Sequence, residues 1–191
     1  MPLAPPVNRS PIHTRRIECT SYRRDDGLYD IEGRLTDVKS YSFQSEYRGE
    51  IKPGEPVHDM WLRLTVDDEM TVREVEAKTD SGPYPAVCPA INPAFAKLKG
   101  LVVGPGWNKK VRELLGGVRG CTHLVDLLGP LGTVTLHTVR WSGSAPGAKP
   151  RPPSKPPLNI CHAWAADGEI VRREYPELYT GSADPAGRPG R

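Results

Sequence analysis

A thiol and an imidazole lie close together in the segment GCTHL, residues 120–124. Apolar residues at helical spacing follow, so Cys121 is expected on the first turn of a helix. Unpaired backbone N–H groups and the helix dipole stabilise an anion there, which favours a thiolate at Cys121. Thiolates bind metals and attack carbon. The segment therefore predicts a cysteine that acts as a ligand or as a nucleophile.

His123 follows two residues later, about 200° around an ideal helix from Cys121. Both side chains reach one ligand only if that turn is irregular, and the alternative is a local hydrogen bond of His123. Cys88 lies between a valine and a proline and could equally fill space in the core. His58 precedes an apolar stripe and could equally be a hydrogen-bonded partner of Asp59.

Composition indicates one soluble domain with tails. The chain has 191 residues, 37% hydrophobic and 26% charged, with a formal net charge of +3. No apolar run approaches the roughly 18 residues of a membrane-spanning helix. The first residues lack the apolar stretch of a secretory signal, so a cytoplasmic protein is expected. The four cysteines are widely spaced, which argues against a disulfide framework.

Basic residues occur at Arg15-Arg16 and Arg23-Arg24, and Asp25-Asp26 follow at once. With charges interleaved in this way and no nucleic-acid-binding motif, a solvated surface is favoured over a nucleic-acid interface. Neither nucleic acid nor a membrane is therefore expected as a partner.

The distribution of proline and glycine predicts the domain organisation. A proline-rich stretch suits an extended linker, and the apolar segment after it is predicted to dock as a hairpin. The predicted parts are a disordered tail at 1–11, a domain at 12–141, a linker at 142–157, a docking hairpin at 158–180 and a disordered tail at 181–191.

Within the domain, apolar residues first follow the period of two that is typical of strands. Residues 27–43 are predicted as a first strand, and residues 58–66 and 71–77 as a hairpin. Helical spacing follows, predicting helices over 91–98, with Asn92 as a cap, over 107–115, and from Cys121 onward, with a bend or break at Gly129-Pro130. Strands followed by helices predict an α+β fold, with an antiparallel sheet of about three or more strands covered by helices on one face.

Two resemblances extend this picture. The series DGLYDIEGRLTD, PGEPVHDMWLRLTVDD, PYPAVC and GCTHL resembles a bacterial family of unknown function over about residues 12–180. More distantly, residues 58–139 resemble the U-type iron–sulfur cluster scaffold proteins in their order of elements. In those proteins cysteines lie before the second strand, at the sheet-to-helix turn and at the start of the last long helix.

The second resemblance implies that a sheet end, a loop and a helix N-terminus converge on one cavity. His58, Cys88 and Cys121, with Asp59 or His123, would then supply mixed nitrogen, sulfur and oxygen ligands. Such ligands suit zinc or iron(II) rather than magnesium or calcium. The chain departs from the pattern at Gly120, which replaces a histidine.

Three functions follow as expectations. The first is a zinc- or iron-binding protein, with an iron–sulfur accessory role or a metal-handling partner. The second is a thiol enzyme in which Cys121, assisted by His58 or His123, attacks a small acyl or carbonyl compound. The third is a non-catalytic subunit of a larger enzyme, docked through its C-terminal segment.

Overall fold

The computed structural model describes residues 4–141 and 156–181 and confirms the predicted α+β class. The chain forms two compact units, Met1–Ala148 and Lys149–Arg191. The first unit contains the sheet and the helices that pack on it, and it is described first. Residues 4–12 contain no helix or strand.

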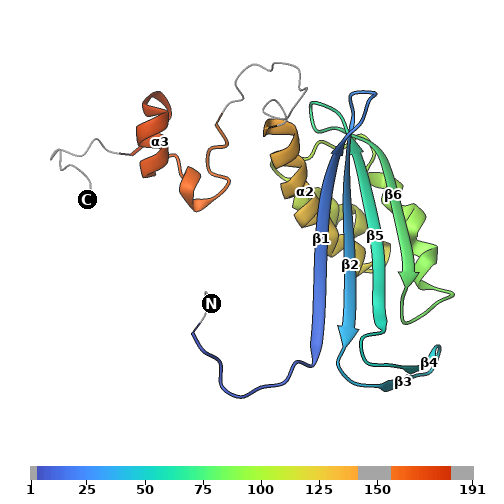
Figure 1. Ribbon diagram of the computed structural model, residues 1–191. Helices are drawn as coiled ribbons and strands as arrows, with labels where there is room; N and C mark the ends of the chain where they lie inside the picture. Colours follow the sequence, from blue (N-terminus) through green and yellow to red (C-terminus); the bar gives the residue numbers. More distant parts are fainter. Residues whose placement is uncertain (1–3, 142–155, 182–191) are drawn as a thin grey trace. The chain divides into compact units, whose positions relative to one another are not determined.

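Four long strands form one antiparallel sheet in the order β1-β2-β5-β6 (Figure 1). Their bounds are β1 His13–Arg23, β2 Tyr29–Lys39, β5 Pro56–Val66 and β6 Val72–Ser81. Two short strands, β3 Phe43–Ser45 and β4 Gly49–Ile51, pair separately within the β2–β5 connection. The predicted first strand is β2, and the predicted hairpin is β5–β6.

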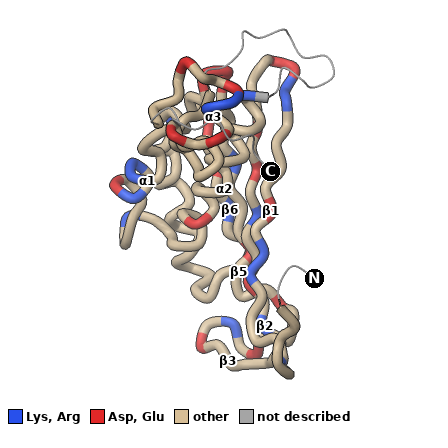
Figure 2. The backbone as a smooth tube through the Cα atoms, turned by 90° about the vertical axis from the view of Figure 1, so that its left-hand side faces the viewer, with Lys and Arg blue, Asp and Glu red and all other residues tan. Residues whose placement is uncertain are grey.

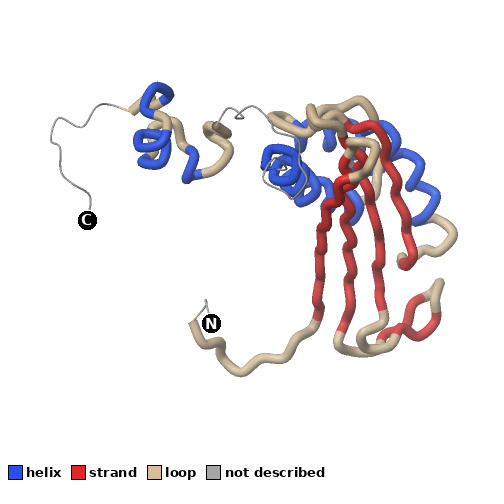
Figure 3. Tube along the Cα trace, turned by 45° about the horizontal axis from the view of Figure 1, so that its top comes forward, coloured by secondary structure: helices blue, strands red, loops and turns tan. Residues whose placement is uncertain are grey.

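Alternation along the strands separates the two faces of this sheet. One face is apolar: Ile31 and Leu35 on β2 and Leu62 and Leu64 on β5 are fully or almost fully buried. The helices pack on this covered face and leave the other face open, as Figure 3 shows. The period of two in the sequence therefore predicted correctly which residues enter the core.

Strand β1 was not predicted from the sequence. Its residues are mostly exposed and its pattern is weakly apolar, because it lies at an edge of the sheet. Arg15 and Arg16, expected on a solvated surface, are both strand residues. Alternation directs Arg15 to the covered face, where it takes part in the site described below.

The helices follow the strands in the chain. They are η1 Cys88–Leu98, α1 Trp107–Leu115, η2 Gly117–Arg119 and α2 Thr122–Trp141. The helix predicted over 91–98 is present as η1, but it is a 3-10 helix and begins earlier, at Cys88. Asn92 does not cap it, since its side-chain oxygen accepts a hydrogen bond from Thr79 at 3.0 Å. The predicted helix 107–115 is confirmed.

Of the bend or break predicted at Gly129-Pro130, the break is wrong, because α2 is one continuous helix with Pro130 inside it. Proline removes one backbone N–H from the helix interior, but four leucines of α2, at 124, 127, 128 and 131, are fully buried. The indole N–H of Trp107 also donates to the carbonyl of Leu128 at 2.8 Å. Packing on the sheet and this hydrogen bond stabilise α2 across the proline.

A glycine allows α2 to approach the sheet. A Cβ placed on Gly33, in the middle of β2, would lie 3.1 Å from Cδ2 of Leu131. That distance is too short for normal packing. The missing side chain therefore allows Leu131 of α2 to pack closely against β2.

The second unit, as described from residue 156 to 181, is helical and contains no strand. It contains η4 His162–Trp164, α3 Glu169–Glu174 and η5 Pro176–Leu178. Val171 is fully buried within it, and the rings of Trp164 and Tyr175 lie 5.8 Å apart. The hairpin predicted at 158–180 was therefore wrong, because the short apolar stretch after the linker favours helical turns. The docking role stays a prediction.

Most of the predicted linker and C-terminal tail lies outside the described residues, which omit 142–155 and 182–191. In the parts that are described, no helix has the length and apolar character needed to cross a bilayer. Acidic and basic residues are interspersed along the backbone (Figure 2).

Candidate metal centre

Three polar residues form one row across the covered face of the sheet. Register places Arg15 on β1 opposite Asp37 on β2, and Asp37 opposite His58 on β5. The next row inward is apolar and contains Leu35 and Met60. We call Arg15, Asp37 and His58 the polar row. It lies near the end of the sheet where β2 finishes and β5 begins.

The carboxylate of Asp37 is the centre of this row. Its side chain is only 3% exposed. Arg15 donates two parallel hydrogen bonds to it, from Nε to Oδ1 and from Nη2 to Oδ2, both at 2.8 Å. Nε2 of His13 lies 3.0 Å from Oδ1. The fork from Arg15 fixes the orientation of the carboxylate and supplies a compensating charge.

Two further imidazoles contact the other carboxylate oxygen. Oδ2 of Asp37 lies 3.1 Å from Nδ1 of His58 and 3.7 Å from Nε2 of His123. His123 is on the first turn of α2, so the helix start covers the polar row. The two rings stack, with centroids 3.6 Å apart and an interplanar angle of 27°. One ligand atom from each of Asp37, His58 and His123 lies within 4.8 Å of the others.

The protonation states of these groups suit a cation. Burial, followed by the charge of the neighbouring His123, lowers the pKa of His58 to about 4. Burial and the charge of Arg15 lower the pKa of His123. Burial alone would raise the pKa of Asp37, but hydrogen bonds and charge from Arg15 bring it below its usual value. At neutral pH the site therefore offers a carboxylate and a neutral imidazole at His58.

One polar atom at this site lacks a hydrogen bond. Nδ1 of His58 is buried and close to Asp37, yet the carboxylate does not lie in a direction that makes a hydrogen bond. A buried polar atom without a partner costs free energy. An added cation would accept the lone pair of this nitrogen, so the arrangement favours an additional ligand.

The structure brings three of the predicted site residues together. His58 and His123 belong to the group around Asp37. Cys121 directly precedes α2, and its Sγ lies 3.9 Å from Nδ1 of His123. Cys121 lies at the cap position just before α2 rather than on its first turn, where it was predicted.

Asp59 and Cys88 are not brought to this group. Asp59 lies on the open face, where Arg34 donates two hydrogen bonds to it at 2.9 and 2.7 Å. Cys88 begins η1 and packs beside Gly82. Among the described residues, neither joins a group of three potential metal ligands. Adjacent residues on a strand point to opposite faces, which explains why His58 and Asp59 separate.

Sequence analysis did not identify Asp37 as a site residue. The signal was nevertheless present, because Asp37 continues the odd-numbered apolar positions Ile31 and Leu35. A carboxylate on the buried face of a strand requires a partner or a ligand. Arg15 and His13 were missed as well, since β1 itself was not predicted.

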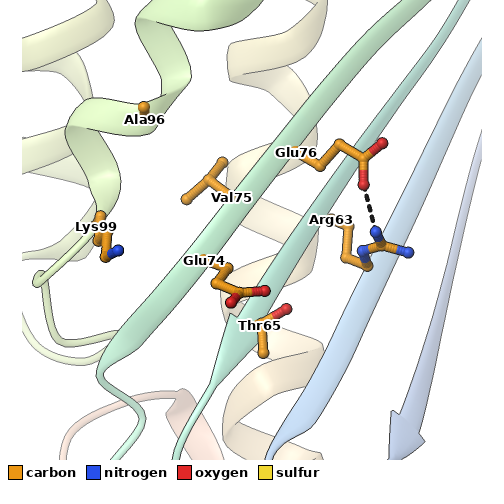
Figure 4. A pocket seen from close by; sticks show the side chains of 7 residues that line it. All are labelled: Arg63, Thr65, Glu74, Val75, Glu76, Ala96 and Lys99. Atoms are coloured by element: carbon orange, nitrogen blue, oxygen red, sulfur yellow. Dashed lines mark hydrogen bonds and ion pairs between the residues drawn. The ribbon is translucent and has the colours of Figure 1, made fainter.

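The structure also has a hollow away from the polar row, along β5, β6 and η1 (Figure 4). Its volume is about 450 Å³. In the picture Arg63 points toward Glu76, with which it forms an ion pair, while Lys99 lies apart on the helical side. The hollow is lined by Arg63, Thr65, Glu74, Val75, Glu76, Ala96 and Lys99. This lining contains neither histidine nor cysteine, so the polar row is the better candidate for chemistry.

The fold and the site thus define an α+β domain with a buried Asp-His-His group. Residues 13–137 match the family described as "protein of unknown function (DUF2889)", and the chain belongs to that family. No curated protein and no solved structure matches the chain. The family match supports the resemblance to a family of unknown function. The resemblance to U-type iron–sulfur scaffold proteins stays a prediction.

Proposed function

We propose that this protein binds a divalent transition-metal ion, zinc or iron(II), through Asp37, His58 and His123. The observation that carries the proposal is the grouping of one buried carboxylate and two imidazoles within 4.8 Å. The three residues come from β2, β5 and the start of α2, so only the folded chain forms the site. Two imidazoles and a carboxylate are a donor set that both ions accept in proteins.

The local charges support a divalent ion. Arg15 pairs with Asp37 and also with Asp126 of α2, at 2.8 Å in each case. The two negative charges of Asp37 and Asp126 therefore exceed the one positive charge of Arg15. With neutral imidazoles, a divalent ion would leave about one positive charge, which a bound hydroxide could balance. Arg15 would then hold the metal-binding carboxylate from the outer shell.

Binding requires a modest rearrangement of the rings. Each lone pair lies in the plane of its ring, and the two planes stack 3.6 Å apart at 27°, whereas both lone pairs must point at a shared ion. The rings of His58 and His123 would therefore splay from their stacked arrangement. Three protein ligands leave at least one position for water or substrate, the arrangement of catalytic zinc and of iron(II) facial sites.

Metal analysis and titration test this proposal. Protein purified without chelator is expected to contain close to one zinc or iron per chain, and apo protein should regain it. Asp37→Asn, His58→Gln and His123→Gln should each weaken binding by about 100-fold or more, since outer-shell changes alone cost 10–100-fold. Asp59→Asn is the matched control on the open face. Equal binding by Asp37→Asn and Asp59→Asn would refute the site.

A second function is favoured by a specific contact. His123 lies between the thiol and the carboxylate, with Nδ1 at 3.9 Å from Cys121 Sγ and Nε2 at 3.7 Å from Asp37 Oδ2. A base that contacts both a nucleophile and an orienting carboxylate is the pattern of thiol catalysis. In this alternative Nδ1 of His123 accepts the thiol proton, and Cys121 attacks a small acyl or carbonyl compound.

The two functions differ in what they require of Cys121. If the thiol is the nucleophile, iodoacetamide should alkylate Cys121 faster than the exposed Cys161, and His123→Gln should abolish the difference. If only the metal site operates, Cys121→Ser should leave zinc binding intact. Alkylation of Cys121 no faster than in unfolded protein would eliminate the thiol enzyme.

A further inference from the structure

Two sulfur atoms and an imidazole nitrogen lie beside the polar row. Sγ of Cys121 lies 3.9 Å from Sδ of Met60 and 3.9 Å from Nδ1 of His123. We call Cys121, Met60 and His123 the soft cluster. It lies one row further into the sheet than His58, because Met60 follows His58 by two residues on the same face of β5. Nδ1 of His123 faces this cluster while Nε2 faces Asp37.

The spacing matches what one shared ion requires. Metal–sulfur bonds are roughly 2.3 Å and metal–nitrogen bonds roughly 2.0–2.1 Å. With these lengths, the two observed distances of 3.9 Å correspond to angles of about 115–130° at the ion. Both Met60 and His123 therefore lie at a distance from Cys121 that allows each to share an ion with the thiolate.

The chemistry of the donors selects the ion. A thiolate and a thioether are soft ligands of the kind that bind copper(I). The Met60 side chain is buried, with the residue 1% exposed, so its sulfur has no solvent to bind. In the metal-free protein the Cys121 thiol donates its proton toward this sulfur. Copper(I) replacing that proton leaves the net charge unchanged, which favours a monovalent ion in a partly buried place.

We propose that Cys121, Met60 and Nδ1 of His123 form a copper(I) site separate from the divalent site at Asp37. The thiol loses one proton on binding, and no electron is transferred. The other two donors, Sδ of Met60 and Nδ1 of His123, bind the ion through lone pairs and lose no proton. The proposal does not depend on the divalent site, because it uses the opposite nitrogen of His123.

A competition titration tests this directly. Copper(I), kept reduced with ascorbate under anaerobic conditions, is titrated into the full chain against bathocuproine disulfonate. Cys121→Ser and Met60→Leu are each expected to weaken binding by about 10-fold or more. About one proton should be released per ion bound. Cys161→Ser is the matched control, since Cys161 is an exposed cysteine of the second unit.

Both test variants should retain the fold. Serine is a preferred helix cap, and Met60→Leu is a volume-conserving core exchange. X-ray absorption of the copper-loaded wild type should show two sulfur neighbours, and Met60→Leu should show one. Asp37→Asn should lose zinc and keep copper(I), which separates failure of this site from failure of the divalent site. Wild-type affinity in both Cys121→Ser and Met60→Leu, or an equal loss in Cys161→Ser, would overturn the proposal.

Discussion

The two faces of the sheet each contain an aspartate held by a forked arginine, and the two pairs differ in their surroundings. On the covered face, Arg15 binds Asp37, whose side chain is 3% exposed. On the open face, Arg34 binds Asp59, whose side chain is 12% exposed, and Arg34 also lies over the ring of Trp61. The ion pair itself is therefore not what distinguishes the two places.

What distinguishes Asp37 is the helix above it. Helix α2 places His123 over the row and Cys121 next to it, while β5 contributes His58. Asp59 has no imidazole in an equivalent position among its described ion-pair partners. The comparison shows that the arginine–aspartate pair gains imidazole and thiol neighbours where the end of the polar row meets a helix start, and lacks them on the open sheet face among the described residues.

The largest expected difference between the faces is steric. Gly33→Leu places a side chain where a Cβ alone would lie 3.1 Å from Leu131. Overpacking of this kind should lower the free energy of unfolding by about 3 kcal/mol. Glu32→Leu, the neighbouring substitution on the open face, should change it by about 0.5 kcal/mol at most. Urea unfolding measures both, and equal losses would show that α2 does not pack tightly on β2.

The next difference concerns the two carboxylates. In metal-free protein, Asp37→Asn leaves Arg15 without its buried partner and should lower the free energy of unfolding by about 2 kcal/mol. Asp59→Asn, whose partner Arg34 is 43% exposed, should cost about 1 kcal/mol or less. Thermal or urea unfolding in chelator checks the order. A larger loss in Asp59→Asn would contradict the burial argument.

A smaller effect should depend on pH. His58 has a pKa of about 4 in the folded protein and about 6.5 when unfolded, so the unfolded state binds more protons between these values. The contribution of neutral His58 is complete above about pH 6.5 and is lost as the pH falls toward 4. His58→Gln should flatten this part of the stability curve of metal-free protein, and Asp59→Asn should keep it. An unchanged slope in His58→Gln would contradict the assignment.

The smallest expected difference separates the two arginines. Lysine cannot donate the parallel pair of hydrogen bonds that arginine makes. Arg15→Lys should therefore lower the free energy of unfolding by about 1 kcal/mol, and Arg34→Lys by about 0.5 kcal/mol. The difference is measurable by urea unfolding of both variants under identical conditions. Greater sensitivity at Arg34 would place the more important pair on the open face.

The sequence by itself determined the fold class, the strands β2, β5 and β6, helix α1 and the position of Cys121 at the start of α2. These features follow from local rules: alternation along strands, helical spacing and glycine at helix ends. The sequence missed β1, because an edge strand needs no strong apolar pattern. Of the bend or break that it predicted at Gly129-Pro130, the break is excluded, because packing keeps α2 in one piece.

Only the tertiary structure decided which polar side chains meet. Asp37, His58 and His123 lie on three separate elements, and strand register together with the crossing of α2 over Gly33 brings them within 4.8 Å. The same register directs Asp59 to the other face, although it is adjacent to His58. The physical reason is that sequence patterns report the environment of one element at a time, whereas a site depends on how several elements pack against each other.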